Sequence, residues 1–317
     1  MDKVSRLSVK RIEEAFTKID PVFLNTPQYI NESLSKLLGV TLVLKIETIN
    51  PIRSFKGRGS DWLVSSVDRD TSVICASAGN FGQAMAYSCR KRNCNLIVYA
   101  SETASPFKVE RMRSFGATVI LHGNDFDAAK MEAKRVAIEK GIRFIEDSQD
   151  IETVEGAGTI GLELLKFPKT IDALLLPLGN GAMFNGISCM YKAASPQTKI
   201  IAVQAAGASA MVDSWKSGKV VSHKTTNTIA DGIAVRIPVP QALEDMKGLI
   251  DDAFLVTEES IHSAMKLLHT HAGIIVEPSG AVGVAALLEH EEKLKGQTVG
   301  TIICGSNLTK EQIDTWL

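Results

Sequence analysis

Cysteine is scarce in this chain of 317 residues, and the five cysteines include no C-x-x-C pair. They are Cys75, Cys89, Cys94, Cys189 and Cys304. An odd number without close spacing argues against a disulfide framework and against a thiolate zinc site. Reduced thiols are typical of the cytoplasm, so we expect a cytoplasmic protein.

An excess of charge of one sign is also lacking, because 35 Lys and Arg residues balance 36 Asp and Glu residues. We therefore expect no nucleic-acid partner and no attraction to anionic lipid. No apolar run approaches the roughly 20 residues that a membrane-spanning helix needs. The first residues, MDKVSRLSVKRIEEAF, carry charges where a signal peptide has an apolar segment, so we do not expect export.

Short apolar runs alternate with amphipathic segments along most of the chain. The runs cover residues 41–47, 72–77, 95–101, 118–122, 142–147, 172–178, 199–205, 253–259 and 298–306. Helical patterns lie between them, most clearly over 125–141, 258–273 and 280–296. Strands that are apolar at nearly every residue are buried on both faces. The pattern therefore predicts an α/β fold of parallel sheets covered by helices on both sides.

The segment NPIRSFKGRG (50–59) places Lys56 between an apolar run and a helical pattern. An amine near a helix N-terminus can be partly desolvated, and a neutral lysine amine can form a Schiff base. Taken alone, however, the segment fits a solvated lysine in a polar loop better.

The segment CASAGNFGQAMAYSCRKR (75–92) passes from an apolar run through Ser77, Ala78, Gly79 and Asn80 into a helical pattern. Free backbone N–H groups at a helix start bind anions, and a substrate carboxylate fits such a site. An ordinary capped helix with a glycine turn explains the residues equally well.

A second turn rich in glycine lies in LLLPLGNGAMFNG (174–186), where glycines let backbone amides close around a phosphate. The spacing G-x-G-x-x-x-x-G differs from the dinucleotide fingerprint. The following apolar run carries Gln204 where an acid is expected. We therefore favour a monophosphate site. Two further segments give weaker indications of function. Glu277 precedes a helix start, where the helix dipole favours an acid in any protein. Cys304 lies where an apolar run ends, which fits a simple turn after a strand.

Taken in order, these five segments resemble the fold-type II pyridoxal-phosphate enzymes, in particular the serine/threonine dehydratase and serine racemase branch. The resemblance extends from about Asn25 to the C-terminus, and the segments 155–165 and 228–235 add to it.

The resemblance implies a role for each segment. Lys56 would form the Schiff base with pyridoxal 5'-phosphate, Phe55 would line its ring, and Asn80 would bind its 3'-oxygen. The substrate carboxylate would bind to the loop formed by Ser77, Ala78, Gly79, Asn80 and Phe81. The cofactor phosphate would bind to Gly179, Asn180, Gly181, Ala182 and Met183. Cys304 would face the pyridine nitrogen, and Glu277 would lie near the ring.

The sequence also departs from this branch. Racemases have serine where this chain has Ala78, and alanine carries no proton, so efficient racemisation is not expected. Phe81 replaces a frequent histidine, and Asn180 and Ala182 interrupt the usual glycines. Gln204 and Ala210 occupy the positions of two metal-ligating acids, so we expect no structural magnesium. No segment that resembles the regulatory domain of biosynthetic threonine dehydratases follows residue 306, so we expect no feedback inhibition by isoleucine.

The family fold implies two open α/β domains, with residues 1–66 and 150–317 in the larger one and 67–149 in the smaller, mobile one. We expect a pyridoxal-phosphate-dependent ammonia-lyase that converts L-threonine or L-serine to a 2-oxo acid, as a homodimer. Two enzyme alternatives stay open. The first is β-elimination or β-replacement on hydroxyaspartate, diaminopropionate or an activated serine, and the second is racemase activity. A cofactor-binding protein without catalysis is a further alternative.

Overall fold

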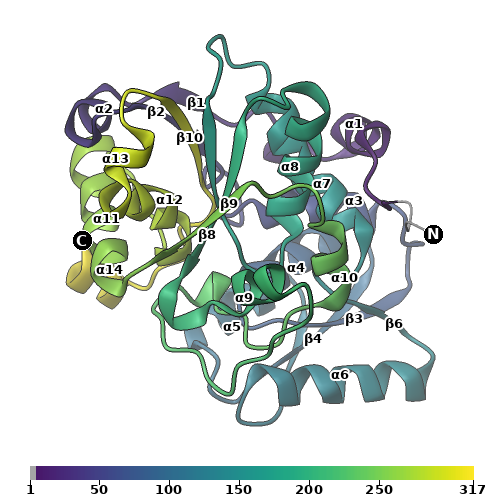
Figure 1. Cartoon of the computed structure of the whole chain (residues 1–317). Helices are drawn as coiled ribbons and strands as arrows, with labels where there is room; N and C mark the ends of the chain where they lie inside the picture. Colours follow the sequence, from purple (N-terminus) through teal and green to yellow (C-terminus); the bar gives the residue numbers. More distant parts are fainter. Residues whose placement is uncertain (1–4) are drawn as a thin grey trace.

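The computed structural model describes residues 5–317, which form two β-sheets with helices on both faces (Figure 1). The strands are β1 (Gln28–Ile30), β2 (Thr41–Ile46), β3 (Ser72–Ala76), β4 (Asn95–Ala100), β5 (Thr118–Leu121), β6 (Arg143–Ile145), β7 (Ala173–Pro177), β8 (Lys199–Ala205), β9 (Asp252–Val256) and β10 (Thr298–Ile303). The α-helices are α1 (Val9–Lys18), α2 (Glu32–Leu38), α3 (Lys56–Val64), α4 (Asn80–Arg92), α5 (Pro106–Ser114), α6 (Phe126–Lys140), α7 (Ile151–Leu164), α8 (Ala182–Ala194), α9 (Ala210–Ser217), α10 (Pro240–Asp245), α11 (Glu258–Ala272), α12 (Pro278–Glu289), α13 (Glu291–Leu294) and α14 (Lys310–Trp316). Short 3-10 helices are η1 (Pro21–Phe23), η2 (Ala206–Ala208) and η3 (Asp231–Ile233).

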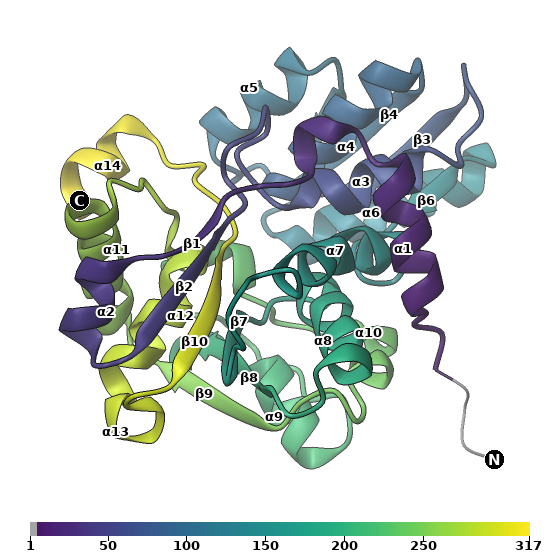
Figure 2. The same ribbon diagram turned by 90° about the horizontal axis from the view of Figure 1, so that it is seen from above.

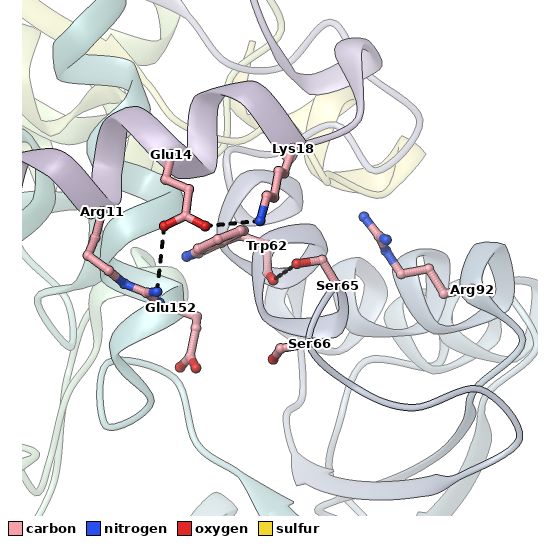
Figure 3. A pocket seen from close by; sticks show the side chains of 8 residues that line it. All are labelled: Arg11, Glu14, Lys18, Trp62, Ser65, Ser66, Arg92 and Glu152. Carbon is pink, nitrogen blue, oxygen red and sulfur yellow. Dashed lines mark hydrogen bonds and ion pairs between the residues drawn. The ribbon is translucent and has the colours of Figure 1, made fainter.

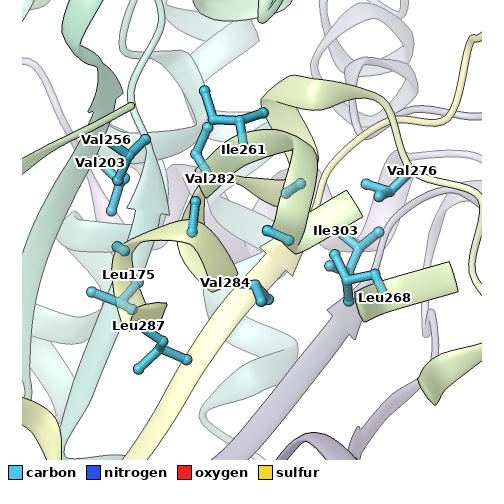
Figure 4. Packing of buried hydrophobic residues seen from close by; sticks show 14 of the residues in the cluster. Leu175, Val203, Val256, Ile261, Leu268, Val276, Val282, Val284, Leu287 and Ile303 are labelled. Carbon is cyan, nitrogen blue, oxygen red and sulfur yellow. The ribbon is translucent and has the colours of Figure 1, made fainter. Parts of the chain in front are cut away.

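The larger sheet has six strands in the order β1-β2-β10-β7-β8-β9, and all neighbours except β1 and β2 are parallel. Strand β10 is buried at every residue, since helices cover both faces. Helices α11 and α12 pack on one face, where Leu175, Val203 and Ile303 meet Val282 and Leu287 (Figure 4). Helices α7, α8 and α9 contribute to the apolar cluster on the other face. The expected parallel α/β fold is confirmed, with one antiparallel edge strand that the sequence pattern did not predict.

The smaller sheet has four parallel strands in the order β5-β4-β3-β6. Alanines of α6 pack on one face, and α3, α4 and α5 pack on the other. In Figure 2 this sheet and its helices form a layer beside the larger sheet. The four strands of this sheet fall within the segment 67–149. That this segment forms a separate domain stays a prediction. Residues 1–4 of the predicted larger domain lie outside the described residues.

One predicted helix is wrong in its bounds. The pattern over 280–296 forms two helices, because α12 ends at Glu289 and α13 begins at Glu291. His290 between them leaves the helical conformation with a φ of −127°, and its ring stacks on Phe254 at 4.0 Å. A tertiary contact therefore ends the helix where the apolar periodicity continues. None of the helices described between residues 5 and 317 is long and apolar enough to cross a membrane.

Candidate active site

All the predicted site residues line one cavity of about 480 Å³, at the carboxyl ends of strands from both sheets. They are Phe55, Lys56, Ser77, Ala78, Gly79, Asn80, Phe81, Gly179, Asn180, Gly181, Ala182, Met183, Glu277 and Cys304. The carboxyl edge is where ligands bind in open parallel sheets, because the loops of several strands meet there.

Lys56 is the first residue of α3, as its position in the sequence predicts. Its Nζ donates to Asp147 Oδ2 at 2.6 Å. The same nitrogen lies 4.7 Å from the centroid of the Phe55 ring and 6.0 Å from that of Phe81. The amine thus lies beside two aromatic rings and one carboxylate, inside the cavity.

The turn before Lys56 is fixed from two sides. Asn50 Oδ1 accepts hydrogen bonds from the N–H groups of Ile52 and Ser54. The Phe55 N–H donates to the Cys304 carbonyl at 3.0 Å. The start of α3 is therefore tied directly to the carboxyl end of β10.

A buried cluster of charges anchors the first turn of α3. Arg58 is fully buried and donates to both carboxylate oxygens of Glu47 and to both of Glu163. Lys45 Nζ also donates to Glu163, at 2.5 Å. Two cations and two carboxylates thus compensate one another, which a buried charge requires.

The loop from Ser77 to Phe81 leads into α4, whose N-cap residue, Gly79, has no side chain that could cap the helix. Ser77 Oγ accepts from the N–H groups of Gly79 and Gly82, at 3.2 and 2.9 Å. A hydroxyl that accepts two hydrogen bonds still has its own proton to donate. The loop therefore presents a hydroxyl donor at a helix N-terminus, which suits a carboxylate.

Asn80, Glu277 and Asn307 form a hydrogen-bonded set behind this loop. Asn80 Nδ2 donates to Glu277 Oε1 at 2.8 Å, and Asn307 Nδ2 donates to Asn80 Oδ1 at 2.8 Å. Burial raises the pKa of Glu277, although Lys108 and the amides of Asn307 and Asn80 oppose the shift. Burial also raises the pKa of the Cys304 thiol, which is therefore neutral at physiological pH.

The loop from Gly179 to Met183 opens helix α8. Gly181 has a φ of +97° and precedes the helix without a side-chain cap. The Ala182 N–H donates to Ser148 Oγ at 3.1 Å. A side chain on Gly179 would lie 3.1 Å from the Gly232 carbonyl, so the backbones approach closely there. A helix N-terminus that follows a glycine turn, and whose N-cap residue has no side chain, is an anion site.

A second hollow is lined by residues of α1, α3, α4 and α7, among them Trp62 (Figure 3). Each of its cations already has a carboxylate partner of its own: Arg11 pairs with Glu155, Lys18 with Glu14, and Arg92 with Asp61. It offers no excess charge to a ligand, and we assign the active site to the other cavity.

No cluster of three metal-ligating side chains occurs between residues 5 and 317. At the positions compared with a metal site, Gln204 Oε1 accepts from the Val212 N–H at 3.1 Å, and Ala210 begins α9.

The profile of a protein family described as "Pyridoxal-phosphate dependent enzyme" matches residues 19–305. The chain belongs to this family. A biosynthetic L-threonine dehydratase of Halalkalibacterium halodurans is 32% identical over 96% of this enzyme and 75% of that protein. A catabolic L-threonine dehydratase of Staphylococcus aureus is 32% identical over 95% of this enzyme and 89% of that protein.

Two solved structures are similar to this pyridoxal-phosphate-dependent enzyme over nearly its whole length. Threonine deaminase isoform 2 of Solanum lycopersicum has a TM-score of 0.89 at 31% identity, over 99% of this chain and 89% of that one. Maize serine racemase has a TM-score of 0.91 at 29% identity, over 96% and 95%. A deaminase and a racemase thus share this fold, so local residues must distinguish the reactions.

The residues present fit the cofactor. Lys56 supplies an amine, the loop from Gly179 to Met183 an anion site, and Cys304 a neutral group at the cavity wall. Buried polar atoms without partners lie on the same wall, namely Asp147 Oδ1 and Ser279 Oγ. Such atoms are costly unless a ligand satisfies them, and a polar cofactor would do so.

Sequence reasoning did not identify Asp147, Lys108 or Asn307 as site residues. Asp147 and Asn307 both follow the end of a parallel strand, β6 and β10. The position after each parallel strand was the available signal, because those ends meet at the cavity. Lys108 lies within α5, and no pattern of the sequence indicates its proximity to Glu277.

Proposed function

We propose that this enzyme is an ammonia-lyase that converts L-threonine, and also L-serine, to the 2-oxo acid and ammonia. The observation that carries the proposal is a single cavity that is lined by Lys56, by the loop from Gly179 to Met183 at the start of α8, and by Ala78. The similarity to L-threonine dehydratases over 95% or more of the chain supports the substrate class.

The cofactor, when bound, supplies the electron sink that makes the substrate Cα–H acidic. Lys56 Nζ takes the Cα proton as a general base. The Ser77 hydroxyl and the start of α4 hold the substrate carboxylate. Asn80 and Cys304 would contact the ring as neutral groups, and the start of α8 would hold the phosphate. Ala78 has no group that exchanges a proton, so a second base for racemisation is absent from that position.

The charges of the cavity wall favour a neutral substrate side chain. Lys108 pairs with Asp231, Lys130 with Glu146, and Arg236 with Asp127. Because these three cations and Lys56 already have carboxylate partners, and the remaining cation of the wall, Lys224, is exposed, a β-hydroxyl substrate fits better than the dianionic hydroxyaspartate.

The test is a screen of purified enzyme against amino acids, following 2-oxo acid release and the visible absorbance of the bound cofactor. We expect 2-oxo acid from threonine and serine, and no activity or lysine-linked absorbance in Lys56→Ala. A spectral change without oxo acid would indicate β-replacement instead. Absence of the visible band in the native enzyme would refute the assignment of Lys56.

We further propose a cytoplasmic homodimer whose residues 67–149 move as a unit against the rest, without a structural metal ion. Buried, unpaired cysteines agree with a reducing compartment. Light scattering after gel filtration tests the dimer, and full activity after dialysis against EDTA is expected.

A further inference from the structure

The ion pair between Lys56 and Asp147 is a feature that the proposed reaction does not yet use. The two side chains are 18% and 14% exposed, and Nζ and Oδ2 are 2.6 Å apart. Within residues 5–317, Asp147 is the one carboxylate at ion-pair distance from Lys56. The rings of Phe55 and Phe81 also lie near this nitrogen.

A strained turn holds Asp147 in place. The next residue, Ser148, has a φ of +68°, which L-residues rarely adopt. Its N–H donates to Thr153 Oγ1 at 2.9 Å, and its Oγ accepts from the Ala182 N–H at 3.1 Å. Such strain persists only where the surroundings impose it. Helix α7 and the start of α8 therefore fix the position of the carboxylate.

The second oxygen of Asp147, Oδ1, is buried and has no hydrogen-bond partner. Asp147 therefore makes one strong interaction, which is with Lys56. A buried carboxylate oxygen without a hydrogen-bond partner is costly in a group that only stabilises the fold.

We propose that Asp147 is a positioning residue that binds the charged Lys56 amine whenever Nζ is not bonded to the cofactor. The inference rests on the proposed role of Lys56. When Nζ takes a proton, the ammonium donates one N–H to Asp147 Oδ2, and the proton stays on nitrogen. The carboxylate keeps its charge, so the pair gains one proton and one positive charge in total.

The test measures how fast the full chain, freed of cofactor, captures added pyridoxal 5'-phosphate at Lys56, as followed by the visible absorbance. An amine that is held by a carboxylate must leave that contact before its lone pair attacks the aldehyde. We expect Asp147→Asn to capture the cofactor about tenfold faster, the factor that corresponds to about 1.4 kcal/mol. Asp147→Glu retains a carboxylate and should keep the native rate.

Asp125→Asn is the matched control, because Asp125 is another carboxylate of the cavity wall without contact to Lys56. Asparagine also preserves its role as the N-cap of α6. Should Asp147→Asn not fold, as judged by circular dichroism, Asp147→Ser must give the same acceleration. An unchanged rate of capture in the folded variant overturns the proposal. If the native chain captures no cofactor, the proposed function fails instead.

Discussion

Glu277 is a buried carboxyl group at the cavity wall, and its titration gives a prediction at the scale of one residue. Burial raises its pKa above the ordinary value of 4.5 in the native state. Between the ordinary and the raised pKa, the native state binds more protons than the unfolded chain. Stability from this group is therefore present at low pH and is lost as the pH rises through the native pKa.

We expect Glu277→Gln to remove this loss. The melting temperature of the variant minus that of the native protein should therefore increase from pH 4.5 upward. Thermal unfolding followed by circular dichroism across that range measures the difference. Glu110→Gln, on the exposed side of α5, is the control and should show no such trend. A constant difference between Glu277→Gln and the native protein at all pH values would contradict the assignment.

At the scale of an element, the start of α8 depends on the conformation of Gly181. With a φ of +97°, an alanine would adopt a backbone that costs about 1–2 kcal/mol, and its Cβ would lie 3.2 Å from Asn185 Nδ2. We expect the strained loop of Gly181→Ala to relax away from the conformation that receives the phosphate, and this should weaken binding of pyridoxal 5'-phosphate about tenfold, since 1.4 kcal/mol corresponds to that factor. A fluorescence titration of the cofactor-free protein measures it.

Gly141 at the C-terminus of α6 is the control, with a φ of +63° and no atom within 4 Å of an added Cβ. Gly141→Ala should carry a similar backbone strain and leave cofactor affinity unchanged. An equal loss of affinity in both variants would mean that the substitutions act by destabilising the whole protein and not by changing the loop at the start of α8.

The anchoring of α3 gives a second prediction at this scale. In Arg58→Ala, two buried carboxylates keep only Lys45 as a cation, and breaking a buried pair costs about 3–5 kcal/mol. Urea unfolding of the two proteins measures this loss. Arg135→Ala on exposed α6, which also removes two ion pairs, should change the unfolding free energy far less. A similar effect of both substitutions would contradict a special role of the buried cluster.

The elements themselves were largely predictable, because strands buried on both faces are mostly apolar, and β7 is apolar along its whole length. The segments that hold Lys56 and Gly181 were predictable for a local reason, namely a turn between a strand and a helix. The partners of these residues were not. Asp147 is 91 residues from Lys56, and Glu163 is 118 residues from Lys45. Such pairs are set by the packing of the two sheets, which local patterns do not specify.

At the scale of the whole molecule, ion pairs connect the smaller sheet's helices to the segment 231–236, which lines the cavity. Lys108 on α5 pairs with Asp231 in η3, and Arg236 pairs with Asp127 on α6. The loop at Ser77, which we propose binds the substrate carboxylate, follows β3 of the smaller sheet, while Lys56 is tied to β10 of the larger one. A substrate that contacts both would draw the two units together and exclude water from the cavity.

We therefore expect the radius of gyration in solution to decrease when L-serine binds to the cofactor-loaded enzyme, as measured by small-angle X-ray scattering. L-Serine amide lacks the carboxylate that Ser77 and the start of α4 would hold, so it should leave the radius unchanged. Ser77→Ala removes one donor and should require a higher serine concentration for the same decrease. An equal decrease with the amide would show that closure does not depend on the carboxylate loop, and no decrease with serine would show that residues 67–149 do not move as proposed.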